Sequence, residues 1–202
     1  MSTKSPNETG DIDAGGFSSW LAKMVEAKQK NATSDVPCGD CNACCRASQF
    51  VQIEASERKA LARIPKQLLF AAPGLEDGTL IMGYDEKGHC PMLKNNACSI
   101  YSVRPKTCRT YDCRLFAGAG IVIPGKEKRG VRQQVERWRF QYPTEKDALE
   151  HKAMRAAAAH ARHEKAGGPG SPPIHPTRLA LRALDTYQDF MPSDAPDSDG
   201  SK

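Results

Sequence analysis

Four cysteines fall within eight residues, in the run Cys38-Gly39-Asp40-Cys41-Asn42-Ala43-Cys44-Cys45, and no other feature constrains the fold of this chain as strongly. All eight cysteines of the 202-residue chain lie between positions 38 and 113. A buried structural thiol has no reason to recur at a spacing of three. Thiolates at such spacings can converge on one soft cation or on an iron–sulfur cluster. The pattern therefore predicts metal binding.

An even number of cysteines is also what a disulfide framework would show. Disulfides need an oxidising compartment. Residues 1–16 have neither the apolar run nor the basic flank of a signal peptide, and no stretch has the length and apolarity of a membrane span. We therefore expect a cytoplasmic protein with no membrane association. Metal binding is then favoured over disulfides and over transient redox pairing of thiols.

The first three cysteines, Cys38, Cys41 and Cys44, form a CxxCxxC run. Bacterial ferredoxins use such a run together with a distant Cys-Pro pair, and Cys90-Pro91 is such a pair. A zinc ribbon fits less well, because the later cysteines do not form a second CxxC pair. The spacing favours an iron–sulfur cluster of the 4Fe–4S type, with Zn²⁺ as the alternative.

Cys44 and Cys45 are adjacent, and this adjacency bears on the number of centres. Neighbouring side chains point to opposite faces of an extended chain and diverge by about 100° on a helix. We therefore expect the two thiolates to reach different centres, so that eight cysteines build two four-thiolate sites. A single cluster with spare thiols is the alternative.

The order of the motifs resembles a known family, the bacterial CxxCxxCC cysteine-cluster proteins of the YkgJ type, described as zinc- or iron-chelating domains. The matching elements are Cys38-x2-Cys41-x2-Cys44-Cys45, Cys90-Pro91-Met92-Leu93, Cys98-Ser99-Ile100-Tyr101, Arg104-Pro105-x2-Cys108-Arg109 and Cys113. They run from about residue 37 to residue 116.

The resemblance implies metal binding at eight residues, which are Cys38, Cys41, Cys44, Cys45, Cys90, Cys98, Cys108 and Cys113. It also implies that Tyr101, Arg104 and Arg109 support the bound metal or cluster. Some related proteins are regarded as iron–sulfur oxidoreductases or protein-lysine methylation enzymes, so an oxidoreductase or a component of a protein-modifying enzyme is an alternative function. The sequence shows no Ser–His–Asp pattern, phosphate loop or paired carboxylates, and we assign no catalytic residue.

Charge is unevenly distributed along the chain. Residues 101–165 hold 15 Lys and Arg against 7 Asp and Glu, whereas the last residues are acidic. A basic stretch can mark a nucleic-acid-binding surface, so a zinc-stapled nucleic-acid-binding module is a further alternative. Arginines beside the cysteines can instead offset the negative charge of thiolate sites, and we expect nucleic acid not to be a partner.

The predicted fold is a small metal-stapled, α-rich cysteine-cluster domain with a minor β-hairpin, followed by C-terminal helices that can hold a protein partner. The expected segments are a disordered N-terminus (1–16), a short helix and linker (17–36), the metal-binding domain (37–116), a helical extension (117–165), a Gly/Pro linker (166–176), a C-terminal helix (177–191) and a disordered acidic tail (192–202).

Apolar spacing and capping residues predict the individual elements. Helices are expected over 16–29, over 145–165 after the N-cap Thr144, and over 177–190. A further helix should carry Val131, Val135, Trp138 and Tyr142 on one face. A short strand is expected over 50–53, and a hairpin is expected between 79–84 and 88–93.

Overall fold

The computed structural model of this chain describes residues 10–30, 32–34, 36, 40–71, 74, 77–164 and 174–193. Cys38, most of the expected 166–176 linker, and the ends of both expected disordered termini lie outside these residues. The chain forms two compact units. We call Met1–Lys30, Cys113–Ile123 and Val135–Lys202 the helical unit, and Asn31–Asp112 with Pro124–Gln134 the cysteine unit.

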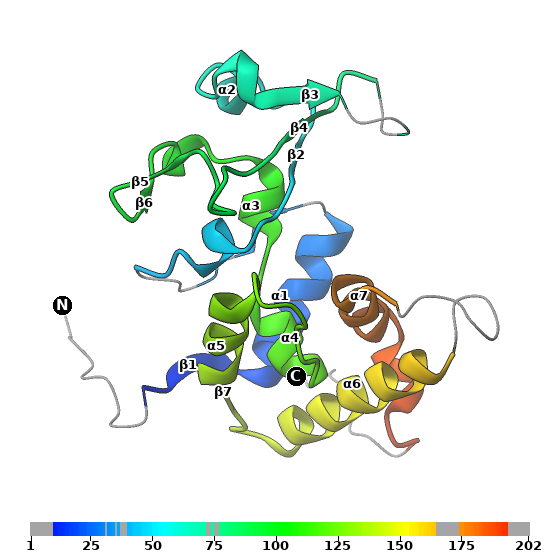
Figure 1. Cartoon of the computed structure of the whole chain (residues 1–202). Coiled ribbons are helices and arrows are strands. Elements are labelled where there is room, and N and C mark those ends of the chain that lie inside the picture. The colour runs from blue at the N-terminus through cyan, green and yellow to red at the C-terminus, as the bar shows by residue number, and fades with distance from the viewer. Residues whose placement is uncertain are drawn as a thin grey trace. The chain divides into compact units, whose positions relative to one another are not determined.

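The helical unit holds the longest helices of the chain (Figure 1). Its elements are β1 (Ile12–Gly16), α1 (Phe17–Gln29), α4 (Arg114–Ala119), β7 (Trp138–Gln141), α6 (Glu145–His163), α7 (Pro176–Thr186) and the 3-10 turn η4 (Tyr187–Phe190). Helix α5 (Arg129–Arg137) runs from the cysteine unit into this unit. The expected helices over 16–29, 145–165 and 177–190 are confirmed by α1, α6 and α7 with η4.

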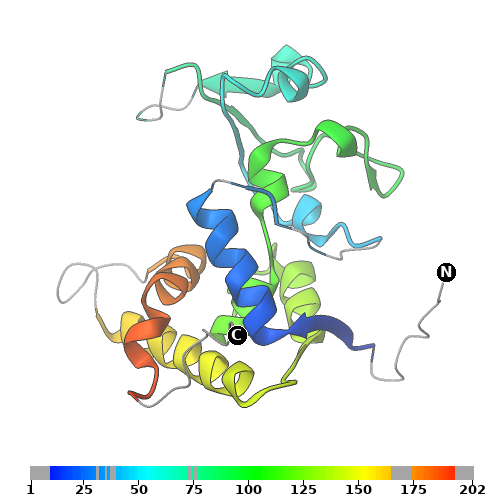
Figure 2. The same ribbon diagram turned by 180° about the vertical axis from the view of Figure 1, so that it is seen from behind.

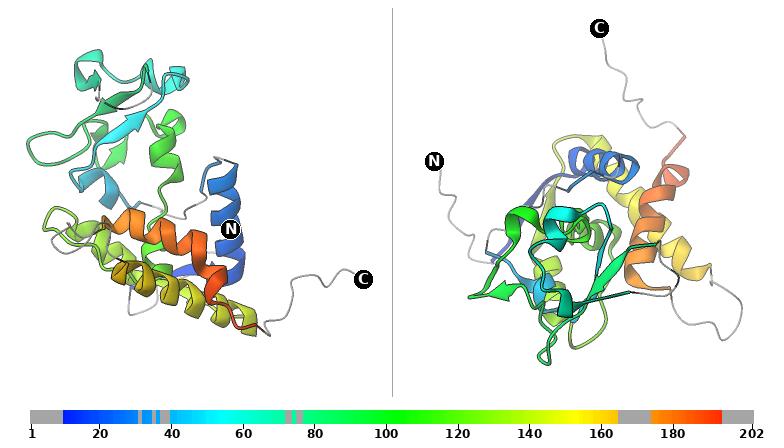
Figure 3. Two further views of the ribbon diagram at one scale, coloured as in Figure 1. Left: turned by 90° about the vertical axis from the view of Figure 1, so that its right-hand side faces the viewer. Right: turned by 90° about the horizontal axis from the view of Figure 1, so that it is seen from above.

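Small side chains govern the packing between α6 and α7, which lie side by side (Figure 3). Ala157 and Ala158 on α6 and Ala180 and Ala183 on α7 are all fully buried. Alanine costs no side-chain entropy in a helix, and its methyl group lets two backbones approach closely. The same argument applies to Gly118 on α4, where a Cβ atom would lie 2.9 Å from the Trp20 ring.

Strands β1 and β7 pair in parallel, and this pairing differs from two expectations drawn from the sequence. Residues 12–16 were expected to be disordered, but they form β1, which runs directly into α1 (Figure 2). The helix expected to reach Tyr142 ends at Arg137. The next residue, Trp138, is buried and begins strand β7, which pairs with β1. A parallel pair between residues so far apart in sequence leaves no local signal.

The cysteine unit consists of short elements around a small core. They are η1 (Ala43–Arg46), β2 (Val51–Ile53), α2 (Arg58–Leu61), η2 (Lys66–Leu68), β3 (Leu69–Ala71), β4 (Leu80–Met82), β5 (Leu93–Lys94), β6 (Ala97–Cys98), η3 (Tyr101–Val103) and α3 (Lys106–Thr110). Its buried core is Val51, Ile53, Ala60, Ile64, Met82, Met92 and Ile100. The expected strand over 50–53 is confirmed by β2.

The expected hairpin between 79–84 and 88–93 is wrong in its pairing. Strand β4 instead lies between β2 and β3 in an antiparallel sheet. The Asp85 carboxylate accepts hydrogen bonds from the backbone N–H groups of Lys87 and His89, at 2.9 and 2.8 Å, and closes a tight turn instead. A hairpin does form between β5 and β6, where Asn95 and Asn96 both have positive φ, the backbone of a type I′ turn.

Helices predominate over sheets in this chain, as expected for an α-rich fold. Among the described residues, no helix combines the length and the apolarity that crossing a bilayer requires.

Candidate metal centre

Five cysteines of the cysteine unit lie in one neighbourhood: Cys44, Cys45, Cys90, Cys98 and Cys108. Negative charge on Cys44, Cys90 or Cys98 raises the pKa of both Cys45 and Cys108. Burial, the largest cause at Cys108, together with this repulsion raises the pKa of its thiol to about 12. Such repulsion requires the sulfurs to be close to one another.

The backbone brings Cys45 and Cys90 together by extending the pairing of β2 with β4. Beyond that pair, the Ser48 N–H donates to the Gly88 carbonyl at 2.9 Å, and the Cys90 N–H donates to the Cys45 carbonyl at 2.7 Å. The two chain segments therefore run antiparallel from the sheet to the cysteines.

Cys98 reaches the same neighbourhood through the β5–β6 hairpin, in which it pairs with Leu93. The Leu93 N–H donates to the Cys90 carbonyl at 2.9 Å, so the hairpin starts one turn after Cys90. Burial raises the pKa of the Cys90 thiol, and hydrogen bonds from the backbone N–H groups of Met92 and Leu93 partly oppose this shift. Amide donors aimed at a sulfur are what a bound thiolate requires.

Cys44 and Cys45 sit in the 3-10 turn η1, and their thiols are in contact. The hydrogen bond from Cys45 is the largest cause that lowers the pKa of Cys44 to about 7, and the same bond raises the pKa of Cys45. The expected divergence of these two side chains is therefore not what the structure shows.

Arg46 connects η1 to the two other cysteine-bearing segments. Its Nε donates to Asn42 Oδ1 at 2.9 Å and its Nη2 donates to Asn96 Oδ1 at 2.6 Å, while Nη1 lies 3.4 Å from His89 Nε2. The Asn42 side chain also donates to the Asn96 carbonyl at 2.8 Å. These asparagines were not among the predicted site residues, although the Asn95-Asn96 pair is a recognisable turn signal.

Of the three supporting residues that the family resemblance implies, Arg104 acts electrostatically on the cysteines. Its charge lowers the pKa of Cys44 and Cys108, although larger effects accompany it. Its guanidinium carbon lies 4.0 Å above the centre of the Tyr101 ring, which is 61% exposed. Arg109 instead forms an ion pair with Glu57, with 3.7 Å between Nη2 and Oε1.

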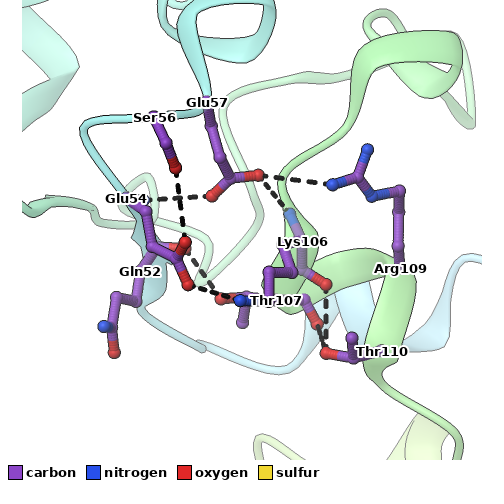
Figure 4. Close-up of polar contacts among 8 residues, drawn as sticks. All are labelled: Gln52, Glu54, Ser56, Glu57, Lys106, Thr107, Arg109 and Thr110. Atoms are coloured by element: carbon purple, nitrogen blue, oxygen red, sulfur yellow. Dashed lines mark hydrogen bonds and ion pairs between the residues drawn. The ribbon is translucent and has the colours of Figure 1, made fainter. Parts of the chain in front are cut away.

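Helix α3 carries Cys108 and is fixed to the sheet by polar contacts (Figure 4). The Thr107 hydroxyl donates to the Gln52 carbonyl at 2.7 Å. The Lys106 ammonium pairs with Glu54 at 2.6 Å, and the Lys106 backbone N–H donates to Glu57 Oε1, also at 2.6 Å. Nothing in the sequence indicates these partners, because they lie some fifty residues apart and share no motif.

The other three predicted ligands do not take part in these contacts among the described residues. Cys41 is half-buried in a loop, and Cys38 lies outside the described residues. Cys113 belongs to the helical unit, where it is buried and accepts a hydrogen bond from Trp138 Nε1 at 3.1 Å. Within the described part of the chain, no three Cys, His, Asp or Glu side chains already have the arrangement of a metal site.

A comparison with protein families matches residues 37–137 to the CxxCxxCC family, whose description is "putative zinc- or iron-chelating domain". This chain belongs to the CxxCxxCC family. The match extends beyond residue 116, where the sequence motifs end, to the last residue of α5. Comparisons with curated proteins and with solved structures found no match.

Proposed function

We propose that this CxxCxxCC protein binds a metal ion or cluster through thiolates drawn from one group of five cysteines, which are Cys44, Cys45, Cys90, Cys98 and Cys108. The observation that carries the proposal is the proximity of these cysteines, since charge on Cys44, Cys90 or Cys98 raises the pKa of both Cys45 and Cys108. Bringing thiolates together costs free energy when no cation is present. A soft cation removes this repulsion, and its binding is therefore favourable. The family description agrees with this chemistry.

We favour an iron–sulfur cluster of the 4Fe–4S type over Zn²⁺. Two features support iron: the CxxCxxC run with a distant Cys90-Pro91, and the amide hydrogen bonds from Met92 and Leu93 to the Cys90 sulfur. A bound cluster would supply one-electron redox chemistry, whereas zinc would supply a structural cross-link.

The division of all eight cysteines into two four-thiolate sites stays a prediction. The contact between Cys44 and Cys45 supports one shared centre, because both thiols already face the same neighbours. We also propose that metal stabilises the cysteine unit, whose described core is small, and that the protein is cytoplasmic, where thiols stay reduced.

Purification without oxygen, followed by iron, sulfide and zinc analysis and a visible spectrum, tests the proposal. We expect iron with acid-labile sulfide and a broad brown absorption. Cys90→Ser and Cys98→Ser should each lower the metal content, whereas Ser102→Ala, at an exposed position of η3, should not. Colourless protein with stoichiometric zinc would exclude the cluster and keep the metal site. Wild-type protein free of both metals would refute the proposal.

A further inference from the structure

Helix α3 cannot hold its own position, and it carries Cys108 at its centre. A helix of five residues lies far below the length at which an isolated helix is stable. Its N-cap is Pro105, whose side chain has no acceptor for the N–H groups of the first turn. The placement of Cys108 therefore depends on side chains from outside the helix.

Glu57 supplies the missing acceptor from the N-cap position of another helix, α2. Its Oε1 atom accepts the backbone N–H of Lys106 at 2.6 Å and lies 3.7 Å from the Arg109 guanidinium. Its Oε2 atom accepts the Glu54 backbone N–H at 3.0 Å. One carboxylate thus contacts α3 two residues before Cys108 and one residue after it (Figure 4).

Burial distinguishes Glu57 from the other contacts of α3. Its side chain is 10% exposed, whereas Glu54, which pairs with the Lys106 ammonium, is 41% exposed. An exposed ion pair contributes little to stability. Breaking the contacts of a buried carboxylate is strongly destabilising, because it leaves the carboxylate or its donors without partners. The Glu57 contacts should therefore dominate the docking of α3.

We propose that Glu57 is a positioning residue of the metal centre: it holds α3 against the segment between β2 and α2, so that the Cys108 thiolate can reach the metal. This inference rests on the proposed function. Loss of Glu57 should affect the Cys108 ligand specifically. Loss of a residue that only stabilised the fold would not have this specific effect.

Titration of the metal-free full-length protein with Co²⁺ under anaerobic conditions tests this role, because the thiolate-to-cobalt absorption reports the number of sulfur ligands. In a four-thiolate site, loss of Cys108 removes about one quarter of that absorption per bound ion. We expect Cys108→Ser and Glu57→Ala to show the same loss, and the double variant to show no further loss, since both act on the same ligand. Glu57→Gln, whose side-chain oxygen can still accept the Lys106 N–H, should restore most of the absorption.

A pair of variants at Lys106 isolates the backbone hydrogen bond. Lys106→Ala removes the partly buried ion pair with Glu54 but keeps the backbone N–H, and it should leave the spectrum close to wild type. Lys106→Pro also removes the N–H, at a first helical position where proline is tolerated. The proline variant should therefore reproduce the loss seen in Glu57→Ala, without any change to the Glu57 side chain.

The outcomes separate this inference from the proposed function. If wild-type protein binds no Co²⁺ and is purified without iron or zinc, the metal centre itself is refuted. If wild type binds and Glu57→Ala keeps the full absorption, Glu57 does not position Cys108. An additive loss in the Glu57→Ala/Cys108→Ser double variant would also overturn the inference, because it would show that Glu57 acts on the centre by another route.

Discussion

Cys44 and Cys45 are the residues at which single-residue geometry matters most. The 3-10 turn η1 puts their thiols in contact, and the pKa of Cys44 falls to about 7 while the pKa of Cys45 rises. One thiolate and one thiol then share a proton, so one cation can replace that proton and bind both sulfurs.

We expect Cys44→Ser and Cys45→Ser each to lose most of the bound metal, with little further loss in the double variant. Shared ligation predicts this result, because either substitution removes a ligand of the same centre. Metal content and visible spectrum, measured on folded protein without oxygen, provide the readout. Loss of about half the metal in each single variant, and nearly all in the double variant, would instead support two separate four-thiolate sites.

In the helical unit, the surroundings of His151 strongly change the pKa of its ring. Its ring stacks on Phe17 with a centroid distance of 4.3 Å, and its Nδ1 lies 2.6 Å from the Tyr142 hydroxyl. Burial, followed by the nearby charge of Arg155, lowers the pKa of His151 to about 4. The folded protein therefore keeps this ring neutral at pH values where the unfolded chain already binds a proton.

This difference in proton binding predicts a stability contribution that is complete above about pH 6.5 and is lost as the pH falls toward 4. The shift corresponds to at most about 3 kcal/mol, and partial exposure of the ring reduces it to about 1–2 kcal/mol. His151→Phe should shrink the difference in unfolding free energy between pH 7 and pH 4.5 by this amount. His163→Gln, at an exposed position of the same helix, is the control. An unchanged difference in His151→Phe would contradict the prediction.

At the scale of elements, Asp147 joins the starts of two helices. One carboxylate oxygen accepts the backbone N–H of Ser18 in α1 at 2.9 Å, and the other accepts the N–H of Thr144, the N-cap of α6, at 3.0 Å. The residue is 2% exposed. Burial alone would raise its pKa, but the hydrogen bonds from Thr144 and Ser18 hold the pKa below its ordinary value.

Asp147→Ala should lower the free energy of unfolding by about 3 kcal/mol, because it removes a cap and leaves a buried donor unpaired. Asp147→Asn should cost roughly half as much, since the amide oxygen still accepts one of the two bonds. Glu145→Ala, at an exposed position in the same helix turn, should change stability by less than about 0.5 kcal/mol. Guanidinium unfolding followed by circular dichroism measures all three. Equal stability of Asp147→Ala and Glu145→Ala would show that the bridge is unimportant.

At the scale of the whole molecule, the two units differ in what can stabilise them. The helical unit packs long helices through a buried stripe that includes Met154, Ala157 and Ala180. The described core of the cysteine unit is small, and its elements are two to five residues long. Thiolate metal sites contribute roughly 10–16 kcal/mol, comparable to the entire stability of a small domain.

Removal of the metal should therefore unfold the cysteine unit first and leave α6 largely intact. Hydrogen exchange of the metal-free protein, followed by mass spectrometry, measures both regions in one experiment. We expect fast exchange in β2, β4 and α3 and retained protection in α6, where helix propensity is local and the alanine face stays packed. Persistent protection throughout the cysteine segment would show that apolar packing alone folds it.

Local patterns in the sequence were sufficient for several elements and for the chemistry of the site. Apolar residues recur at the helical period in α1 and are buried there, as Phe17, Trp20 and Leu21 show. Thr144 is the N-cap of α6. The cysteine spacing indicated the family to which the chain belongs. Such features depend on neighbours in sequence, so a single sequence contains them.

Long-range pairing decided the rest. The partner of β1 is a strand more than a hundred residues away, and the acceptor for the first turn of α3 is Glu57, which forms part of no motif. The contact between the Cys44 and Cys45 thiols is also a feature that their adjacency in sequence did not predict. The sequence determined which side chains can bind metal and which segments prefer to be helical. Only the tertiary structure decided which cysteines meet and what holds them there, because those contacts depend on the distance between residues in space and not along the chain.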